Sequence, residues 1–170
     1  LLLAGPGILG WAPAYLVLLA PALVLAARRH ERATLGGGLT TAAASLMALV
    51  VVCPDPATVL AWASPAPQAA RLAGLLFAYF FGTVLYVKTN IRERGSSAFY
   101  AASVGWHTLA TLATALPLPG GPAPAWAVLF ALATLRAAWV PRHTPPLSPA
   151  RIGLVEVAFC VAILLIVAVA

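Results

Sequence analysis

The sequence predicts an all-α protein, a polytopic integral membrane bundle with about six transmembrane helices. Of its 170 residues, 62% are hydrophobic and only 8% are charged, so a single soluble core cannot bury the apolar side chains. Stretches along the chain approach the roughly 20 apolar residues that the hydrocarbon core of a bilayer requires. In lipid, every backbone N–H and C=O group must be paired within the protein, and a helix achieves this within one segment.

Turn and charge signals divide the chain into the expected spans. A basic stretch at 28–32 ends the first span, and Pro54-Asp55-Pro56 ends the second. Residues 57–64 are apolar but too few to cross a bilayer, so they form either a segment at the outer surface or a kinked continuation of the second helix. Within a single transmembrane domain, the spans are expected at about 8–27, 34–52, 68–94, 97–116, 125–140 and 150–170.

The first two spans show typical membrane features. Trp11 and Tyr15 suit an interface at the start of the first span, and Pro21 predicts a kink within it. The second span is weakly apolar, and its triplet Gly36-Gly37-Gly38 allows helices to approach closely. No Gly-Lys-Ser/Thr sequence follows this triplet and no strand precedes it, so it does not predict a nucleotide phosphate site.

The third span leads into the stretch around which the chain is arranged. Residues 72–87 carry no charge, and a basic, polar run then continues to Gly95, which suits the left-handed position after a helix end. Gly74, Ala78 and Gly82 recur at intervals of four residues. We therefore expect these three residues to form a ridge that packs tightly against a neighbouring helix.

The last three spans place ionisable groups inside the membrane. His107 lies near the midpoint of the fourth span, where such a group is costly and usually faces protein or water. An outer loop at 117–122 precedes the fifth span, which carries Arg136 one turn before its end. Glu156 lies about 7 to 9 Å into the last helix, too deep to be ionised without a partner. Arg136 and Lys88 are the candidate partners, and we expect Glu156 to face the bundle.

Topology explains the net charge of +6 better than nucleic-acid binding does. The ten Lys and Arg residues form short clusters between the apolar spans. If six helices alternate in direction, all of these residues except Arg71 lie on one side, which predicts that this side is cytoplasmic. We therefore expect the lipid bilayer as a partner, and no nucleic acid.

Motifs that carry chemistry are few. Cys53 and Cys160 fall at different depths, so we expect two packing residues and no disulfide. The sequence contains no Cys-x-x-Cys pair and no His-x-x-Glu-His pattern, and it shows no nucleophile with an adjacent base. Its single Asp, Asp55, is expected outside, which argues against Mg²⁺-dependent diphosphate transfer. We predict no metal and no cofactor, and the sequence leaves enzyme status open.

Three stretches carry a family resemblance. Gly82 to Gly95 reads GTVLYVKTNIRERG, Arg28 to Arg32 reads RRHER after a Pro-Ala-Leu helix, and Ile152 to Glu156 reads IGLVE at the entry of the last span. In this order they resemble the YwiC-like family of bacterial polytopic membrane proteins. The resemblance implies a multi-pass protein of the bacterial cytoplasmic membrane, without implying an activity. Family members also carry an N-terminal helix with a His-Gly-Ala-Trp-like sequence, so we expect this chain to be a fragment that lacks it.

Three functions fit these observations. The first is binding of an anionic lipid headgroup or a small anion at the cytoplasmic face. The second is a transporter or permease component in which intramembrane polar residues line a path. The third is a structural partner in a membrane protein complex, for which small-residue packing suffices. The candidate ligand- or headgroup-binding residues are Lys88, Asn90, Arg92, Arg94 and Arg136, and the candidate intramembrane polar residues are Tyr86, His107 and Glu156.

Overall fold

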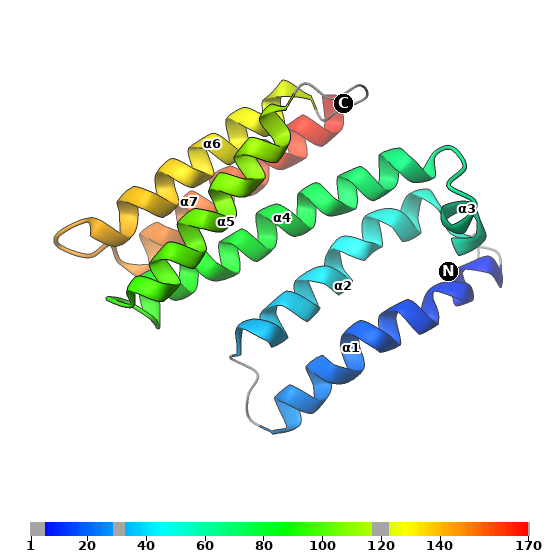
Figure 1. The fold of residues 1–170 in the computed structure, drawn as a ribbon, viewed down its shortest axis with the longest axis horizontal. Helices are drawn as coiled ribbons and strands as arrows, with labels where there is room; N and C mark the ends of the chain where they lie inside the picture. Colours follow the sequence, from blue (N-terminus) through cyan, green and yellow to red (C-terminus); the bar gives the residue numbers. More distant parts are fainter. Residues whose placement is uncertain (1–5, 29–32, 117–122, 170) are drawn as a thin grey trace. The chain divides into compact units, whose positions relative to one another are not determined.

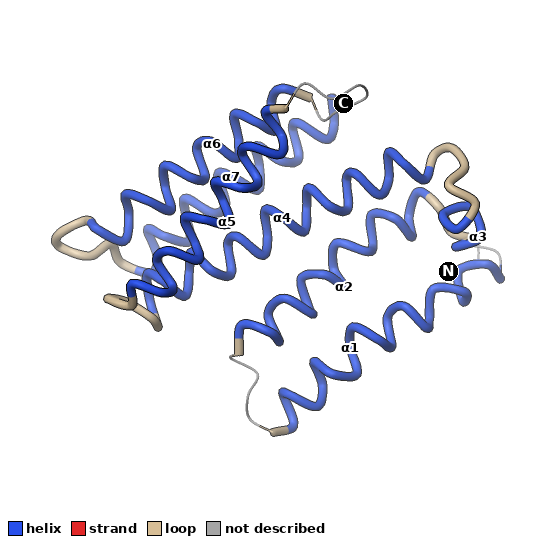
Figure 2. The backbone as a smooth tube through the Cα atoms, in the orientation of Figure 1, coloured by secondary structure: helices blue, strands red, loops and turns tan. Residues whose placement is uncertain are grey.

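The computed structural model describes residues 6–28, 33–116 and 123–169, and these residues form helices joined by short loops (Figures 1 and 2). No strand occurs among them, which confirms the all-α prediction. The elements are η1 Pro6–Trp11, α1 Ala12–Ala27, α2 Thr34–Val52, α3 Pro56–Leu60, α4 Ala66–Ile91, α5 Ser97–Ala115, α6 Pro124–Trp139, η2 Val140–Arg142 and α7 Pro149–Val169.

Membrane-spanning capacity is evident in five helical segments of the described chain, by length and composition. They are Gly7–Ala27, Thr34–Val52, Ala66–Ile91, Pro124–Arg142 and Pro149–Val169. Their apolar side chains remain largely exposed within the protein, as expected where lipid replaces water. The protein is therefore an integral membrane protein.

Helix α5 is not among these five segments, although the sequence predicts a span at 97–116. It is as long as α2, but polar residues lower its average hydropathy. Those residues lie on one side, because Ser103, His107 and Thr114 are buried while Leu109 and Leu112 are exposed. At 1.5 Å per residue α5 is about 28 Å long, close to the bilayer core thickness of about 30 Å. An apolar outer face on a helix of this length supports the six-span topology, which stays a prediction.

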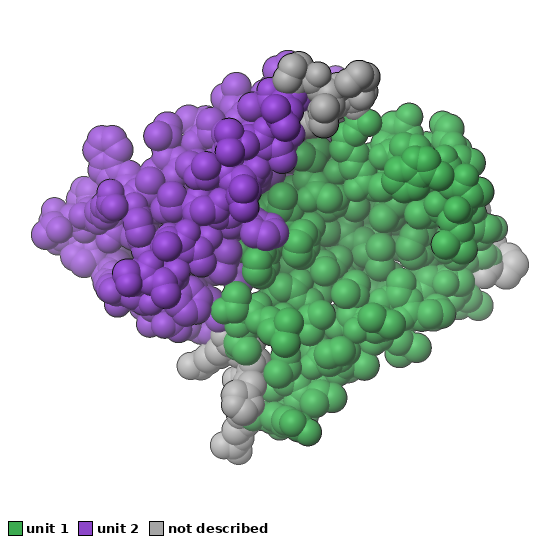
Figure 3. All heavy atoms as spheres, in the orientation of Figure 1, with its two compact units in different colours: residues 1–81 green, residues 82–170 purple. Residues whose placement is uncertain are grey.

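The chain divides into two compact units, residues 1–81 and 82–170, and α4 contributes to both (Figure 3). Unit 1 contains η1, α1, α2, α3 and the first part of α4. A hydrogen bond between residues far apart in the sequence joins the Trp11 indole N–H to the carbonyl of Cys53 at 3.0 Å. Both residues are buried, so this bond fastens the start of α1 to the end of α2.

The connection after α2 tests one of the two interpretations of residues 57–64, the kinked continuation of the second helix. Helix α2 ends at Val52, and Cys53, which follows it, has a non-helical backbone with φ −125° and ψ 79°. Asp55 then caps α3, because its carboxylate accepts a hydrogen bond of 2.9 Å from the N–H of Ala57. Residues 56–60 therefore form a separate short helix, and the interpretation of 57–64 as a kinked continuation of α2 is wrong. Trp62, which follows α3, is exposed.

Unit 2 contains the end of α4 together with α5, α6 and α7. Figure 1 shows the end of α4, the start of α5, the end of α6 and the start of α7 at one end of this unit, which we call the Gly95 end. Gly95 itself has φ +85°, the left-handed conformation that the sequence predicts for it. Helix α4 ends at Ile91, slightly before the predicted boundary of 94, because residues 92–95 form the turn into α5.

The predicted small-residue ridge on α4 exists only in part. A Cβ added to Gly82 would lie 2.8 Å from His107 Nε2, so α4 and α5 are in very close contact there. A Cβ added to Gly74 would meet no described atom within 4 Å, so the prediction is wrong at Gly74. Each step of four residues turns about 40° around an α-helix. Gly74 and Gly82 therefore point about 80° apart, so a neighbour that meets Gly82 need not meet Gly74.

Cysteine labelling distinguishes six spans from five. In a chain with Cys53→Ala and Cys160→Ala, we expect Arg94→Cys and His143→Cys to react with a membrane-impermeant maleimide from the same side of the membrane. If α5 does not cross, the two positions lie on opposite sides, because α6 alone then separates them. Leu60→Cys is the control, since α4 separates it from position 94 in both topologies.

Candidate functional site

A buried ion pair joins α6 to α7 inside unit 2. The guanidinium of Arg136 donates through Nη1 to Glu156 Oε1, and the two side chains are 5% and 15% exposed. The Thr83 hydroxyl on α4 donates to the other carboxylate oxygen, Oε2, at 3.0 Å. Glu156 therefore faces the bundle, and of the two partners that the sequence allows, Arg136 forms the pair.

Aromatic rings enclose the guanidinium of Arg136. Its Cζ lies 4.1 Å from the ring centroid of Tyr86 on α4 and 4.5 Å from that of Phe159 on α7. A cation over a ring face is attracted by the ring's quadrupole, and the gain grows when water is excluded. Arg136 thus connects three helices through one ion pair and two ring contacts.

His107 lies next to this cluster, fully buried on α5. Its Nδ1 is 2.7 Å from the carbonyl oxygen of Ser103, one turn earlier. Because a carbonyl can only accept, Nδ1 carries the proton in this bond. The other nitrogen, Nε2, lies against the α4 backbone at Gly82, which is the close contact described above.

Asn90 is buried on the side of α4 that carries Tyr86. Its side-chain Nδ2 donates to the carbonyl of Tyr86 at 2.8 Å, and only 2% of the residue is exposed. The sequence grouped Asn90 with the headgroup-binding candidates, whereas the structure places it with the interior residues. The intramembrane candidates Tyr86, His107 and Glu156 also lie in this interior region.

The other headgroup candidates lie towards the Gly95 end. Lys88 is half-buried, and its Nζ lies 5.8 Å from the centroid of the Phe99 ring. Arg92 and Arg94 are exposed. The candidate set is therefore divided, because Arg136 and Asn90 face the interior while Lys88, Arg92 and Arg94 lie near the surface.

A small polar pocket of about 180 Å³ opens at the Gly95 end. The guanidinium of Arg142 is held beside it, with Cζ 4.7 Å from the centroid of the Tyr100 ring. Tyr100 is fixed in turn, since its hydroxyl donates to the carbonyl of Ala138 at 3.1 Å. The residues that line the pocket are Thr89, Gly95, Ser96, Ser97, Tyr100, Pro141 and Arg142.

Sequence reasoning missed Arg142 as a site residue, although two signals pointed to it. Ser96 is a typical N-cap before an apolar helix, and its hydroxyl accepts from the N–H of Phe99 at 3.4 Å. The first N–H groups of such a helix favour negative charge. Arg142 follows α6 directly, so an antiparallel pairing of α5 and α6 brings it to the start of α5.

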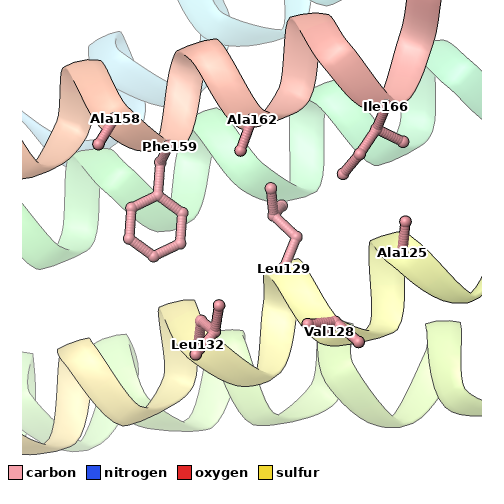
Figure 4. Close-up of a pocket in the computed structure, with 8 residues that line it drawn as sticks. All are labelled: Ala125, Val128, Leu129, Leu132, Ala158, Phe159, Ala162 and Ile166. Carbon is pink, nitrogen blue, oxygen red and sulfur yellow. The ribbon is translucent and has the colours of Figure 1, made fainter. Parts of the chain in front are cut away.

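An apolar groove of about 550 Å³ runs between α6 and α7 (Figure 4). Alanines leave space along it, and the ring of Phe159 projects into it from α7 (Figure 4). The same Phe159 ring also contacts the guanidinium of Arg136. The lining residues are Ala125, Val128, Leu129, Leu132, Ala158, Phe159, Ala162 and Ile166.

Among the described residues, no three His, Cys, Asp or Glu side chains gather as they would to hold a metal ion. Cys53 and Cys160 are both free thiols, so no disulfide joins them. The groups available for interaction are therefore the ion pair, hydroxyls, amides and cations described above.

Comparison with known proteins gives one family match, over part of the chain. A sequence model described as YwiC-like protein matches residues 1–52, which confirms the predicted family resemblance for this part of the chain. The matched residues include α1 and α2 of unit 1. No curated protein and no solved structure matches the chain.

Proposed function

For this integral membrane protein, which matches the YwiC-like family over residues 1–52, we propose that the Gly95 end of unit 2 binds an anionic phosphate group. The observation that carries the proposal is the polar pocket beside Arg142. We propose further that the membrane is the bacterial cytoplasmic membrane and that this end faces the cytoplasm. The excess of Lys and Arg residues around it supports that orientation.

The chemistry of the pocket supports an anionic ligand. An Arg guanidinium offers several donors in a planar fork that matches phosphate oxygens. Ser97 lines the same space, and the start of α5 adds the positive end of a helix dipole. Arg142 and the start of α5 thus direct positive charge into one small volume.

The main cation for binding the anion is Arg142, and not Arg136 as the sequence suggested. Glu156 already compensates the charge of Arg136, and aromatic rings cover its guanidinium. Arg92 and Arg94 contribute at longer range, because exposed charges near a membrane surface attract anionic lipids by about 1 kcal/mol each. Lys88, which is half-buried, adds positive charge near the same end.

The test compares Arg142→Gln with Arg94→Gln, a matched loss of one exposed arginine that does not line the pocket. Native mass spectrometry measures binding of phosphatidylglycerol and of phosphatidylcholine to each purified protein. Arg142→Gln is expected to weaken phosphatidylglycerol binding about tenfold or more, since losing a hydrogen bond to a charged group costs about 1.5–3 kcal/mol. Arg94→Gln should change binding by about threefold or less.

A competition arm separates the two sources of phosphate. If millimolar inorganic phosphate displaces the lipid from the unaltered protein, the pocket recognises free phosphate as well as a headgroup. If it does not, a lipid is the ligand. Equal phosphatidylglycerol binding by Arg142→Gln and the unaltered protein would refute the proposal.

Transport is a second candidate function, and the buried polar row in unit 2 supports it. Thr83, Tyr86 and Asn90 recur along one side of α4, and His107 and Glu156 lie on neighbouring helices. A transporter must bring such groups into contact with water. Hydration of this row is therefore the property that distinguishes transport from a purely structural role, in which tight packing suffices.

A further inference from the structure

Buried polar atoms without a hydrogen-bond partner are concentrated in the interior of unit 2. Their residues are at most 6% exposed, and no described residue satisfies these atoms. The atoms are Tyr86 Oη, Asn90 Oδ1, Ser103 Oγ, His107 Nε2, Arg136 Nε and Arg136 Nη2. We propose that ordered water molecules occupy the interior of unit 2 and hydrogen-bond to these atoms.

Leaving such atoms unpaired would be costly for folding. A polar group buried without a hydrogen bond costs about 1–3 kcal/mol in proteins, and water is absent from the surrounding lipid. Six such atoms in one unit would consume most of a typical folding free energy of about 5–15 kcal/mol. Internal water removes this cost, because a buried water typically makes about three hydrogen bonds to otherwise unsatisfied groups.

Hydrogen-bond direction identifies water as the ligand that fits. Because Nδ1 of His107 donates to the carbonyl of Ser103, Nε2 of the neutral ring is an acceptor. Because Nδ2 of Asn90 donates to the carbonyl of Tyr86, Oδ1 also remains as an acceptor. Arg136 Nε and Nη2 are donors, and the hydroxyls of Tyr86 and Ser103 can act in either role.

An anion would leave the two acceptors of this set unsatisfied. It could accept from Arg136, but it would repel the lone pairs of His107 Nε2 and Asn90 Oδ1. The positive charge of Arg136 is already compensated by Glu156. Water both donates and accepts, so it can satisfy every one of these atoms.

The row also indicates where water enters. Asn90 lies one residue before the end of α4, at the Gly95 end. Along the helix axis, Thr83 lies about 10 Å deeper than Asn90 at 1.5 Å per residue. Water that enters beside Asn90 would therefore pass Tyr86 and reach the Thr83 contact with Glu156. This hydration is independent of the Arg142 pocket, so either proposal can fail without the other.

Radiolytic footprinting tests the proposal on the unaltered protein, because X-ray-generated hydroxyl radicals modify side chains that touch bound water. Tyr86 and Tyr79 form a matched pair, since both are fully buried on α4. Only the hydroxyl of Tyr86 is among the atoms without a partner. In purified protein, Tyr86 is expected to be modified at least about fivefold faster than Tyr79, because water contacts Tyr86 alone.

Asn90→Leu provides a second measurement. It removes one water acceptor and adds apolar volume at the entrance, so Tyr86 modification should fall at least about twofold. Circular dichroism checks that the helices are retained. If Tyr86 in the unaltered protein is as slow as Tyr79, the interior is dry and the proposal is wrong.

Discussion

Arg136→Ala is expected to lower the free energy of unfolding by about 3–5 kcal/mol, because it leaves the Glu156 carboxylate buried without its charge partner. Glu156→Ala should have a similar effect, since the guanidinium of Arg136 would then lie between two rings with no carboxylate to compensate it. Equilibrium unfolding in mixed micelles of mild detergent and dodecyl sulfate measures both variants.

The double variant Arg136→Met, Glu156→Leu separates the value of the pair from the cost of breaking it. Replacing a buried ion pair with apolar residues of similar volume is often close to neutral. We therefore expect the double variant to be more stable than either single variant. Arg151→Ala, an exposed arginine on α7, is the control and should change stability by less than about 0.5 kcal/mol. If the single variants match this control, the ion pair does not stabilise unit 2.

Gly82→Ala is expected to destabilise the protein by about 1–3 kcal/mol, because the new methyl group must displace the His107 ring. The added Cβ would lie 2.8 Å from Nε2 and 3.1 Å from Cε1 of that ring. The ring cannot move freely, since Nδ1 is hydrogen-bonded to the backbone of its own helix. Thermal unfolding in detergent, followed by circular dichroism, measures the loss.

Gly74→Ala is the matched control, because it makes the same change on the same helix where a Cβ meets no described atom within 4 Å. It should be neutral or stabilise by up to about 1 kcal/mol, since Ala is the better helix former. His107→Ala should restore most of the stability that Gly82→Ala loses, by removing the ring. Equal effects of the two glycine substitutions would show that contact with His107 does not limit the size of residue 82.

Sequence reasoning predicted the features that depend on composition and local order. The helical membrane class follows from the apolar composition, and the turn after α4 follows from the place of Gly95 behind a basic run. It also predicted that Glu156 would face the bundle with a cationic partner. Each of these inferences needs only the identity of residues and their spacing along one helix.

The remaining features depend on how each helix is rotated against its neighbours, which spacing alone does not determine. Arg136 and Lys88 were equivalent partners for Glu156 until the contacts of α6 and α7 were known. Gly74 had the spacing of a packing residue, but a Cβ added there meets no described atom within 4 Å, whereas one added to Gly82 meets His107. Arg142 lines the polar pocket because α5 and α6 pack side by side, which the sequence alone does not show.

The enclosure of Arg136 has a consequence for biosynthesis. Helix α6 is translated before α7. The guanidinium of Arg136 is therefore made before the Glu156 carboxylate that compensates its charge. A long cationic side chain near a helix end can meanwhile extend towards lipid headgroups. Arg136 lies three residues before the end of α6 at Trp139, within reach of that boundary. The arrival of α7 therefore decides whether this arginine stays at the interface or turns inward, and we expect α6 and α7 to settle in the bilayer as a hairpin.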